Sequence, residues 1–267
     1  MSRLTDILVI DDEQVVREGL CRVCEAGGLT IDAVGDAATG LQKLRTGGYR
    51  LVVCDVMLPE LDGFQVLSAM KAEGITTPLI MITGCSTMQN AVNALKEGAI
   101  DFIPKPFTVD ELDSGIRRGL KHQKLATEAA AHGVPAGNVP QLAQPCPVGS
   151  YRLGGLSWVR MESDGIGLVG VTQLFTKTIS APRELAFFDM DADLVQAAPC
   201  ANLTSEDSLV HGILSPLSGQ IVARNDALLS RPELIAHEPY AAGWLYKIVP
   251  VNLAYELNNL IPCTQDI

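Results

Sequence analysis

Basic residues are scarce in this chain of 267 residues, which has 20 Lys and Arg against 31 Asp and Glu and a formal net charge of −11. Both halves share the shortage, because residues 1–131 carry 13 basic and 18 acidic residues and the remainder carries 7 and 13. Binding to the phosphates of a nucleic acid requires a basic surface. The composition therefore argues against nucleic acid as a partner of either half.

Long apolar runs are missing as well, since none approaches the roughly 18 residues that span a bilayer. The start, MSRLTDILVIDDE, has acids where a signal peptide keeps its apolar core. The seven cysteines are odd in number and scattered, which does not suit a disulfide framework. We expect a soluble, cytoplasmic protein with free thiols and no membrane partner.

What the chain does have is apolar residues, at 47%, and enough length for two separate cores. The first half alternates short, mostly apolar runs with amphipathic helical patterns. The runs are residues 6–12, 30–35, 51–56, 78–84 and 101–105, and the helical patterns are residues 15–26, 37–45, 63–72, 88–96 and 109–132. Runs of this kind suit buried parallel strands. The pattern predicts an α/β fold with a doubly wound, five-stranded parallel sheet.

Three segments are predicted along the chain: residues 1–131 with an extended last helix, a linker over 132–150, and a mostly β domain over 151–267. The last helix is longer than the sheet needs, and its tail past Lys121 is mostly polar or alanine. We expect this tail to be a solvated spacer, with a short helical contact between two copies as the alternative. The linker is rich in Pro, Gly and Ser. The final segment has short strand candidates separated by turns, typical of a barrel or sandwich.

Polar residues lie at the ends of the strand-like runs in the first half. They are Asp11, Asp12, Asp55, Thr83 and Lys105. The carboxyl ends of parallel strands meet at one edge of the sheet, so these side chains should be neighbours. Crowded carboxylates are stabilised by a hard cation such as Mg²⁺, which also attracts a phosphoryl group. A hydroxyl and an ammonium can contact the phosphoryl oxygens opposite the metal.

The motifs around these residues resemble the receiver domain of two-component response regulators, which is flavodoxin-like. They are IDDE at 10–13, CDVMLPELDGF at 54–64, MITG at 81–84 and FIPKPF at 102–107. The resemblance implies that Asp55 is the phosphoacceptor. It also implies that Asp11 and Asp12 bind Mg²⁺ together with Asp55 and the backbone carbonyl of Met57.

The same resemblance implies a switch. Thr83 is the switch hydroxyl, Lys105 contacts the phosphoryl group, and Phe102 is the aromatic that rotates when Thr83 moves. A cis peptide bond before Pro106 is expected to aim the lysine inward. The response should reach the surface of the fourth helix, fifth strand and fifth helix. The last strand and helices of the domain are also a candidate surface for a homodimer.

The second half resembles the H protein of the glycine cleavage system, which has a barrel-sandwich hybrid fold. The motifs are at 156–172, SPLSGQIVARNDALLSRPEL at 215–234 and EPYAAGWLYKI at 238–248. Family members carry lipoate on a hairpin lysine, but residues 202–223 contain no lysine and Ser208 stands at that position. A serine hydroxyl cannot form the lipoyl amide, so no lipoate is expected. Nearby His211 is expected to be a surface or half-buried strand residue.

These observations favour a response regulator that a sensor histidine kinase phosphorylates on Asp55 and that catalyses only its own phosphotransfer and dephosphorylation. Its second domain would be a degenerate module for contacts with an unknown protein. One alternative is a regulated lipoyl-type carrier or adaptor linked to glycine cleavage and one-carbon metabolism. The other is an unrecognised transcriptional regulator, although the chain has neither a G-x-x-x-x-G-K-[ST] loop nor a basic helix-turn-helix.

Overall fold

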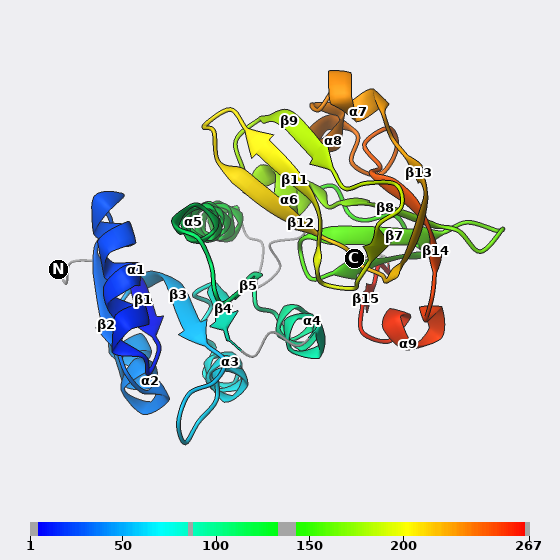
Figure 1. The fold of residues 1–267 in the computed structure, drawn as a ribbon. Helices are drawn as coiled ribbons and strands as arrows, with labels where there is room; N and C mark the ends of the chain where they lie inside the picture. Colours follow the sequence, from blue (N-terminus) through cyan, green and yellow to red (C-terminus); the bar gives the residue numbers. More distant parts are fainter. Residues whose placement is uncertain (1–4, 85–87, 133–142, 265–267) are drawn as a thin grey trace.

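The computed structural model of the chain describes residues 5–84, 88–132 and 143–264 and shows an α/β part beside a mostly β part (Figure 1). The α/β part is a five-stranded parallel sheet in the order β2-β1-β3-β4-β5. Its strands are β1 (Thr5–Ile10), β2 (Ile31–Val34), β3 (Tyr49–Asp55), β4 (Leu79–Thr83) and β5 (Asp101–Pro104). Its helices are α1 (Gln14–Ala26), α2 (Ala37–Thr46), α3 (Gly63–Ala72), α4 (Met88–Lys96) and α5 (Val109–Ala131).

Both faces of this sheet are covered. Ile7 and Val9 of β1 belong to the core under α1 and α5, whereas Leu8 and Ile10 belong to the core under α2, α3 and α4. Since strand side chains alternate between faces, burial on both sides requires strands that are apolar throughout. The predicted doubly wound fold is confirmed.

Two helices begin with reciprocal caps close to the carboxyl edge of the sheet. In α3, Asp62 accepts from the backbone of Gln65 while the Gln65 side chain accepts from the backbone of Asp62. Thr108 and Glu111 form the same pair at the start of α5. Each pair satisfies two backbone donors that a helix start leaves without partners. The caps thereby define where the chain turns after β3 and after β5.

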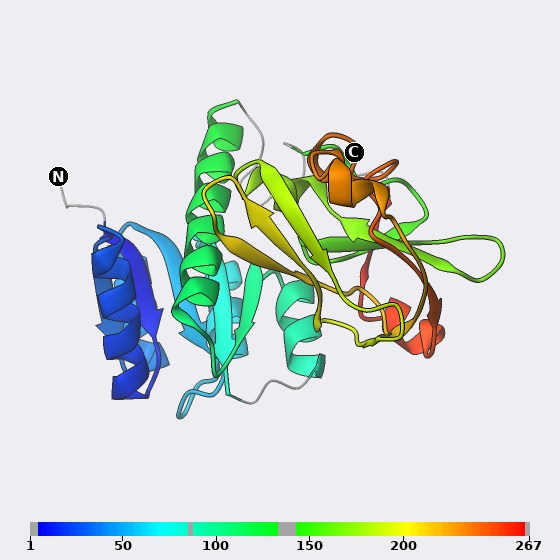
Figure 2. The ribbon, with the colours of Figure 1, turned by 45° about the horizontal axis from the view of Figure 1, so that its top comes forward.

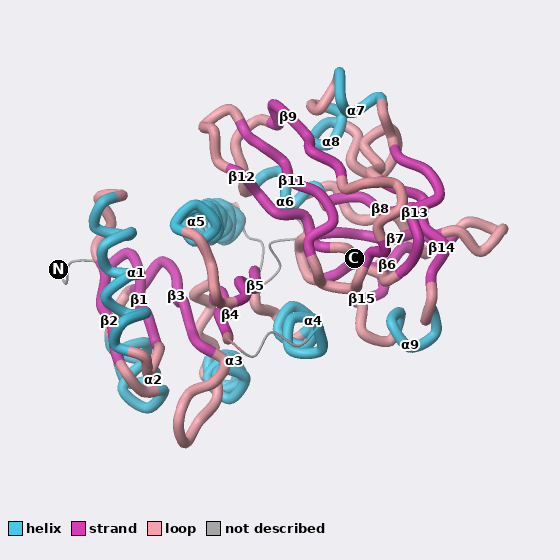
Figure 3. The backbone as a smooth tube through the Cα atoms, in the orientation of Figure 1, coloured by secondary structure: helices cyan, strands magenta, loops and turns pink. Residues whose placement is uncertain are grey.

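The second part has two antiparallel sheets around one core (Figure 3). One has seven strands in the order β10-β13-β14-β8-β7-β6-β15, and the other has three in the order β12-β11-β9. The strands are β6 (Ser150–Leu153), β7 (Ser157–Met161), β8 (Gly167–Val171), β9 (Pro182–Phe187), β10 (Asp193–Leu194), β11 (Pro199–Ser205), β12 (Val210–Leu214), β13 (Gly219–Arg224), β14 (Tyr246–Pro250) and β15 (Ile261–Pro262). Short helices connect them: α6 (Gln173–Lys177), α7 (Ala227–Ser230), α8 (Leu234–His237) and α9 (Leu253–Leu257). The expected, mostly β fold of this part is confirmed.

The two parts pack on each other through α4 and α5. Val92 and Leu95 of α4 are 1% exposed and belong to the hydrophobic core of the β part. Figure 2 shows α5 standing beside the β11–β12 hairpin. The end of α5 also packs on the β part, because Leu125 and Ala126 contact Ala143 and Leu174. The expectation of a solvated spacer was therefore wrong.

The predicted linker lies partly outside the described residues. Its last residues, 143–150, are described and contact the β part rather than solvent alone. Cys146 is buried with Trp158 and Tyr240, and the Tyr240 hydroxyl donates to the Gln144 carbonyl at 3.1 Å. The chain is thus fixed to the β part before β6 begins.

Candidate functional site

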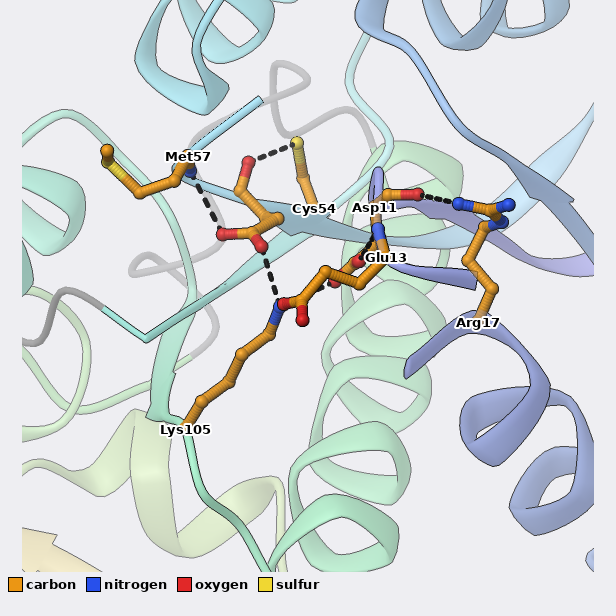
Figure 4. Close-up of polar contacts among 7 residues, drawn as sticks. Asp11, Glu13, Arg17, Cys54, Met57 and Lys105 are labelled. Carbon is orange, nitrogen blue, oxygen red and sulfur yellow. Dashed lines mark hydrogen bonds and ion pairs between the residues drawn. The ribbon is translucent and has the colours of Figure 1, made fainter. Parts of the chain in front are cut away.

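An acidic site lies where β1, β3 and β5 end. Asp11 follows β1 directly, Asp55 ends β3, and Lys105 follows β5. Pairing of Ile10 with Cys54 aligns the ends of β1 and β3, which brings the two carboxylates together. Figure 4 shows the Lys105 side chain reaching from its own strand end toward Asp11 and Glu13. The predicted meeting of side chains at this edge is what the topology produces.

Lys105 is the cation at the centre of the site. Its Nζ lies 2.6 Å from Asp55 Oδ2, 2.9 Å from Asp11 Oδ2 and 2.9 Å from Glu13 Oε1. Asp11 and Asp55 are almost inaccessible, at 0% and 3% exposed, whereas Glu13 is exposed. Glu13 was not among the predicted site residues, although it belongs to the IDDE motif. The Lys105–Pro106 peptide bond is cis, as predicted.

Burial and charge act against each other at this site. Burial raises the pKa of Asp11, and hydrogen bonds from Lys105 and from the Glu13 backbone only partly offset it. For Lys105, burial alone would lower the pKa, but hydrogen bonds with Asp55, Asp11 and Glu13 raise it above the ordinary value. The ammonium is therefore charged at neutral pH and stabilises the neighbouring carboxylates.

The donor set fits a hard divalent cation. Asp11, Asp12 and Asp55 each offer a carboxylate oxygen, and these atoms lie within 4.8 Å of one another. Asp12 is exposed, so the group opens toward solvent on one side. Oxygen ligands of this kind suit Mg²⁺, which keeps several waters when bound. The backbone N–H of Met57 donates to Asp55 Oδ1 at 2.9 Å (Figure 4), and a role for its carbonyl as a ligand stays a prediction.

Close backbone approach maintains the loop after β3. A Cβ on Gly63 would lie 2.5 Å from the Asp55 carbonyl oxygen, closer than any side chain permits. The Gly63 N–H donates to the Val56 carbonyl at 2.9 Å, which closes the loop over the site. A glycine at position 63 thus lets α3 begin directly beside Asp55.

Thr83 ends β4, the neighbour of the strand that carries Asp55, and Phe102 lies on the edge strand β5. Thr83 is 0% exposed at the end of β4, and the Lys105 N–H donates to its carbonyl at 2.8 Å. Phe102 is 6% exposed and packs in one cluster with Met81 and with Ala91 and Ala94 of α4. A displacement of Phe102 would therefore change the packing of α4.

The outer surface of α4, β5 and α5 is covered by the β part. In addition to the apolar contacts of α4, Lys96 Nζ donates to the Asn258 carbonyl at 2.8 Å and the Tyr255 hydroxyl to Gln89 Oε1 at 2.8 Å. Lys121 Nζ of α5 donates to Ser180 Oγ at 3.1 Å. The surface from which a receiver would signal is thus a domain interface in this chain.

His211 of β12 is the buried polar centre of that interface. Its Nδ1 lies 2.6 Å from Ser114 Oγ and 3.1 Å from Arg118 Nη1, and its Nε2 lies 2.9 Å from Ser205 Oγ. Arg118 also pairs with Asp101 at the start of β5. His211 is 1% exposed, so the expectation of a surface or half-buried position was wrong. The reason is α5, which covers β12 from a distant part of the sequence.

Ser208 lies exposed in the turn of the β11–β12 hairpin, with φ of 64°. Ser205 and Leu209 close this turn through a backbone hydrogen bond of 3.0 Å. The adjacent Asp207 accepts from Ser180 Oγ at 2.7 Å. The hairpin tip therefore presents serine and acidic side chains beside α5.

Each of the two parts of the chain matches a known protein family. The response regulator receiver domain model matches residues 7–117, and the glycine cleavage H-protein model matches residues 150–265. Response regulator MprA of Mycobacterium ulcerans is 34% identical over 128 residues, 48% of this chain and 55% of the relative. Transcriptional regulatory protein FixJ of Bradyrhizobium diazoefficiens is 35% identical over 138 residues, 51% of this chain and 67% of the relative. The chain spans about half the length of the first curated relatives that it matches.

Among solved structures, a glycine cleavage system H protein from Mycobacterium marinum is 25% identical, with a TM-score of 0.39 over 43% of this chain and 91% of that one. Within the described ranges, no helix combines the length and apolar character needed to cross a membrane. Through residues 7–117 the chain belongs to the response regulator receiver domain family, and residues 150–265 match the glycine cleavage H-protein model.

Proposed function

We propose that the protein is a response regulator phosphorylated on Asp55 by a sensor histidine kinase. In this proposal residues 1–131 form the receiver, residues 132–150 the linker, and residues 151–267 an H-protein-like domain that acts by protein contact in the cytoplasm. The observation that carries it is the buried pair of Asp55 and Asp11, bridged by Lys105. Several relatives of the receiver are named as response regulators or transcriptional regulators, which supports the same assignment.

The transfer reaction follows from the residues at the site. An oxygen of Asp55 attacks the phosphorus of a phosphohistidine, the nitrogen–phosphorus bond breaks, and an acyl phosphate forms. Lys105 leaves its ion pair with the Asp55 carboxylate and contacts the phosphoryl oxygens, as does the Thr83 hydroxyl. Mg²⁺, held by Asp11, Asp12, Asp55 and the Met57 carbonyl, would supply charge neutralisation to the phosphoryl group. We propose no catalytic activity beyond this self-phosphorylation and its reversal by hydrolysis.

The covered surface of α4, β5 and α5 indicates how phosphorylation would act. Inward movement of Thr83 makes room for Phe102, and Phe102 packs on α4. Movement of α4 shifts Val92 and Leu95, which are part of the core of the second domain. Phosphorylation would then favour an arrangement in which the domains separate. A homodimer through the last strand and helices would use the same surface, so it requires that separation.

The second domain is proposed to recognise a protein rather than to carry lipoate. Ser208 provides no amine for the lipoyl amide. The two lysines of the second half, Lys177 and Lys247, lie elsewhere: Lys177 ends α6, and Lys247 is on β14 in an ion pair with Glu162. No contact of the described residues favours a carrier in one-carbon metabolism or a nucleic-acid partner. Intact mass of protein made in its native host would reveal a lipoyl adduct directly.

The experiment uses acetyl phosphate as phosphodonor, with and without Mg²⁺. Intact mass should show one added phosphoryl group in the wild type with Mg²⁺ and none in Asp55→Asn. Asp110→Asn, an equivalent change on the exposed start of α5, should behave as the wild type. Small-angle scattering should then show an increased radius of gyration only in the phosphorylated samples.

Two results would contradict the proposal separately. Phosphoryl incorporation that persists in Asp55→Asn would remove Asp55 as the acceptor. Full phosphorylation with an unchanged radius and unchanged hydrogen exchange in α4 and α5 would retain the acceptor but reject the release of the second domain.

A further inference from the structure

A cavity of about 550 Å³ lies between the two domains, at the opposite edge of the receiver sheet from Asp55. Pro78 and Leu79 at the start of β4 and Asp101 at the start of β5 form part of its wall. Arg118, His122 and Ala126 of α5 form another side, and β6, α6 and the residues near them close it from the second domain. Its volume is in the range of sites for small molecules.

Most of this wall is apolar. The apolar side chains come from α3, β4 and α4 on one side and from the second domain on the other. They include Leu67, Met70, Leu79, Leu95, Leu156 and Phe175. Such a wall stabilises a ligand with an apolar body, because the ligand removes this surface from water.

Two polar side chains of the wall have nitrogens without a partner. Arg118 Nε and His122 Nδ1 are buried and make no hydrogen bond in the described structure. The two residues are four apart on α5 and so lie on the same helix face. The other nitrogens of Arg118 are engaged by Asp101, Ser114 and His211. Arg118 Nε can only donate, and His122 Nδ1 donates in the tautomer that carries the proton there. A buried donor that lacks an acceptor costs free energy, so an acceptor atom at this wall would be stabilising.

The wall carries one cationic side chain that has no ion pair. Of the cations that line the cavity, Lys71 is paired with Glu97 at 2.8 Å and Arg118 with Asp101, which leaves Arg152. Arg152 donates to the Gly154 carbonyl at 3.0 Å, and among the ion pairs of the described residues it has none. An anionic ligand would neutralise this charge.

We propose that the cavity binds a small organic carboxylate with an apolar body. The carboxylate accepts hydrogen bonds from Arg152 and from the unpartnered nitrogens of α5, and the apolar body lies against the leucine, methionine and phenylalanine side chains. Because both domains contribute walls, the ligand binds the docked arrangement and stabilises it against separation. This inference depends on the docked arrangement and does not require that Asp55 is the phosphoacceptor.

The test is isothermal titration calorimetry of octanoate into the unphosphorylated full-length chain. We expect saturable binding of octanoate and at least about tenfold weaker binding of octylammonium, which has the same tail and the opposite charge. Arg152→Gln should weaken octanoate binding by about tenfold, which corresponds to one lost charge-assisted hydrogen bond. Arg160→Gln, the same change on the neighbouring strand β7 and outside the cavity wall, should leave it unchanged.

A variant that keeps every charge provides a second test. Thr76 is an exposed residue of the cavity wall, and Thr76→Trp should obstruct entry and reduce octanoate binding. The proposal is overturned if octanoate does not bind the wild type at millimolar concentration. Equal affinity of octanoate and octylammonium, or unchanged octanoate affinity in both Arg152→Gln and Thr76→Trp, would equally overturn it. The comparison of octanoate with octylammonium on the wild type tests the proposal even where a variant fails to fold.

Discussion

Mild acid is expected to separate the two domains by protonating His211. Arg118 Nη1 can only donate, so His211 Nδ1, 3.1 Å away, must be the acceptor and the ring must be neutral. The proton is then on Nε2, which donates to Ser205 Oγ. A second proton would place an N–H on Nδ1 against the Arg118 N–H. Protonation therefore breaks the polar centre of the interface and adds a buried positive charge.

The magnitude follows from the pKa of His211. Burial first, and then the charges of Arg118 and Lys121, lower this pKa from 6.5 to about 4, while Asp207 acts in the opposite direction. If the ordinary value returns on separation, the separated state binds more protons between pH 6.5 and pH 4. Stability of the docked state is thus fully present above this window and is lost as the pH falls through it. At pH 5.5 the loss is about 1.4 kcal/mol, or roughly tenfold in the docking equilibrium.

The assay is small-angle scattering at pH 7.5 and pH 5.5. Lower pH is avoided because the isoelectric point is near 4.8, and a protein with little net charge tends to associate. The wild type should show a larger radius of gyration at pH 5.5. His211→Asn keeps an oxygen that can accept from Arg118 and cannot be protonated in this range, so its radius should change less. His237→Asn removes an exposed histidine of α8 and should behave as the wild type. Burial also lowers the pKa of His122 to about 4, so His122→Asn should remove part of the same effect.

Equal radii of the wild type at both pH values would refute this reasoning. So would a His211→Asn variant that separates in acid as readily as the wild type, because the titrating group would then be elsewhere.

Three further changes test other parts of the structure. Leu95→Ala removes a side chain buried at the domain interface and should weaken docking by about 2–5 kcal/mol. The radius of gyration should then increase while phosphorylation is retained, and an unchanged radius would exclude a role of this contact. Gly219→Ala would place a Cβ 2.3 Å from the Val249 carbonyl oxygen and should lower the calorimetric melting temperature of the second domain alone; an unchanged transition would contradict the close approach. Lys105→Ala should leave two buried carboxylates without their cation, so thermal stability should fall without Mg²⁺ and recover in part with it; a fall that Mg²⁺ does not reduce would argue against metal binding there.

The receiver site was predictable because its geometry is a property of parallel sheets. Asp11 and Asp55 end neighbouring strands, and Lys105 follows the edge strand, so any doubly wound arrangement brings them to one edge. The strand runs were recognisable because both faces of the sheet are buried. The roles proposed for Thr83 and Phe102 depend on the resemblance, and the structure adds that Phe102 packs on α4.

The domain interface was not predictable in the same way. Periodicity shows that a helix has an apolar face but not what covers it, so Leu125 and Ala126 could not be assigned a partner. His211 contacts Ser114, a residue 97 positions earlier, and no local pattern records such a contact. Its burial depends on how two separate folds dock, which is determined by the combined surface of both.

In the docked arrangement one surface of the second domain is exposed and another is buried, a difference that the sequence does not reveal. At the hairpin tip, Glu206 and Ser208 are exposed although the domains are in contact, so separation would change their accessibility little. The side of the hairpin that carries His211, together with Phe175 of α6, is buried against α5. If phosphorylation separates the domains, it changes the accessibility of the surface that is buried in the docked arrangement. The partner whose binding depends on phosphorylation is therefore expected to recognise the buried side of β12 and α6 rather than the position where related proteins carry lipoate.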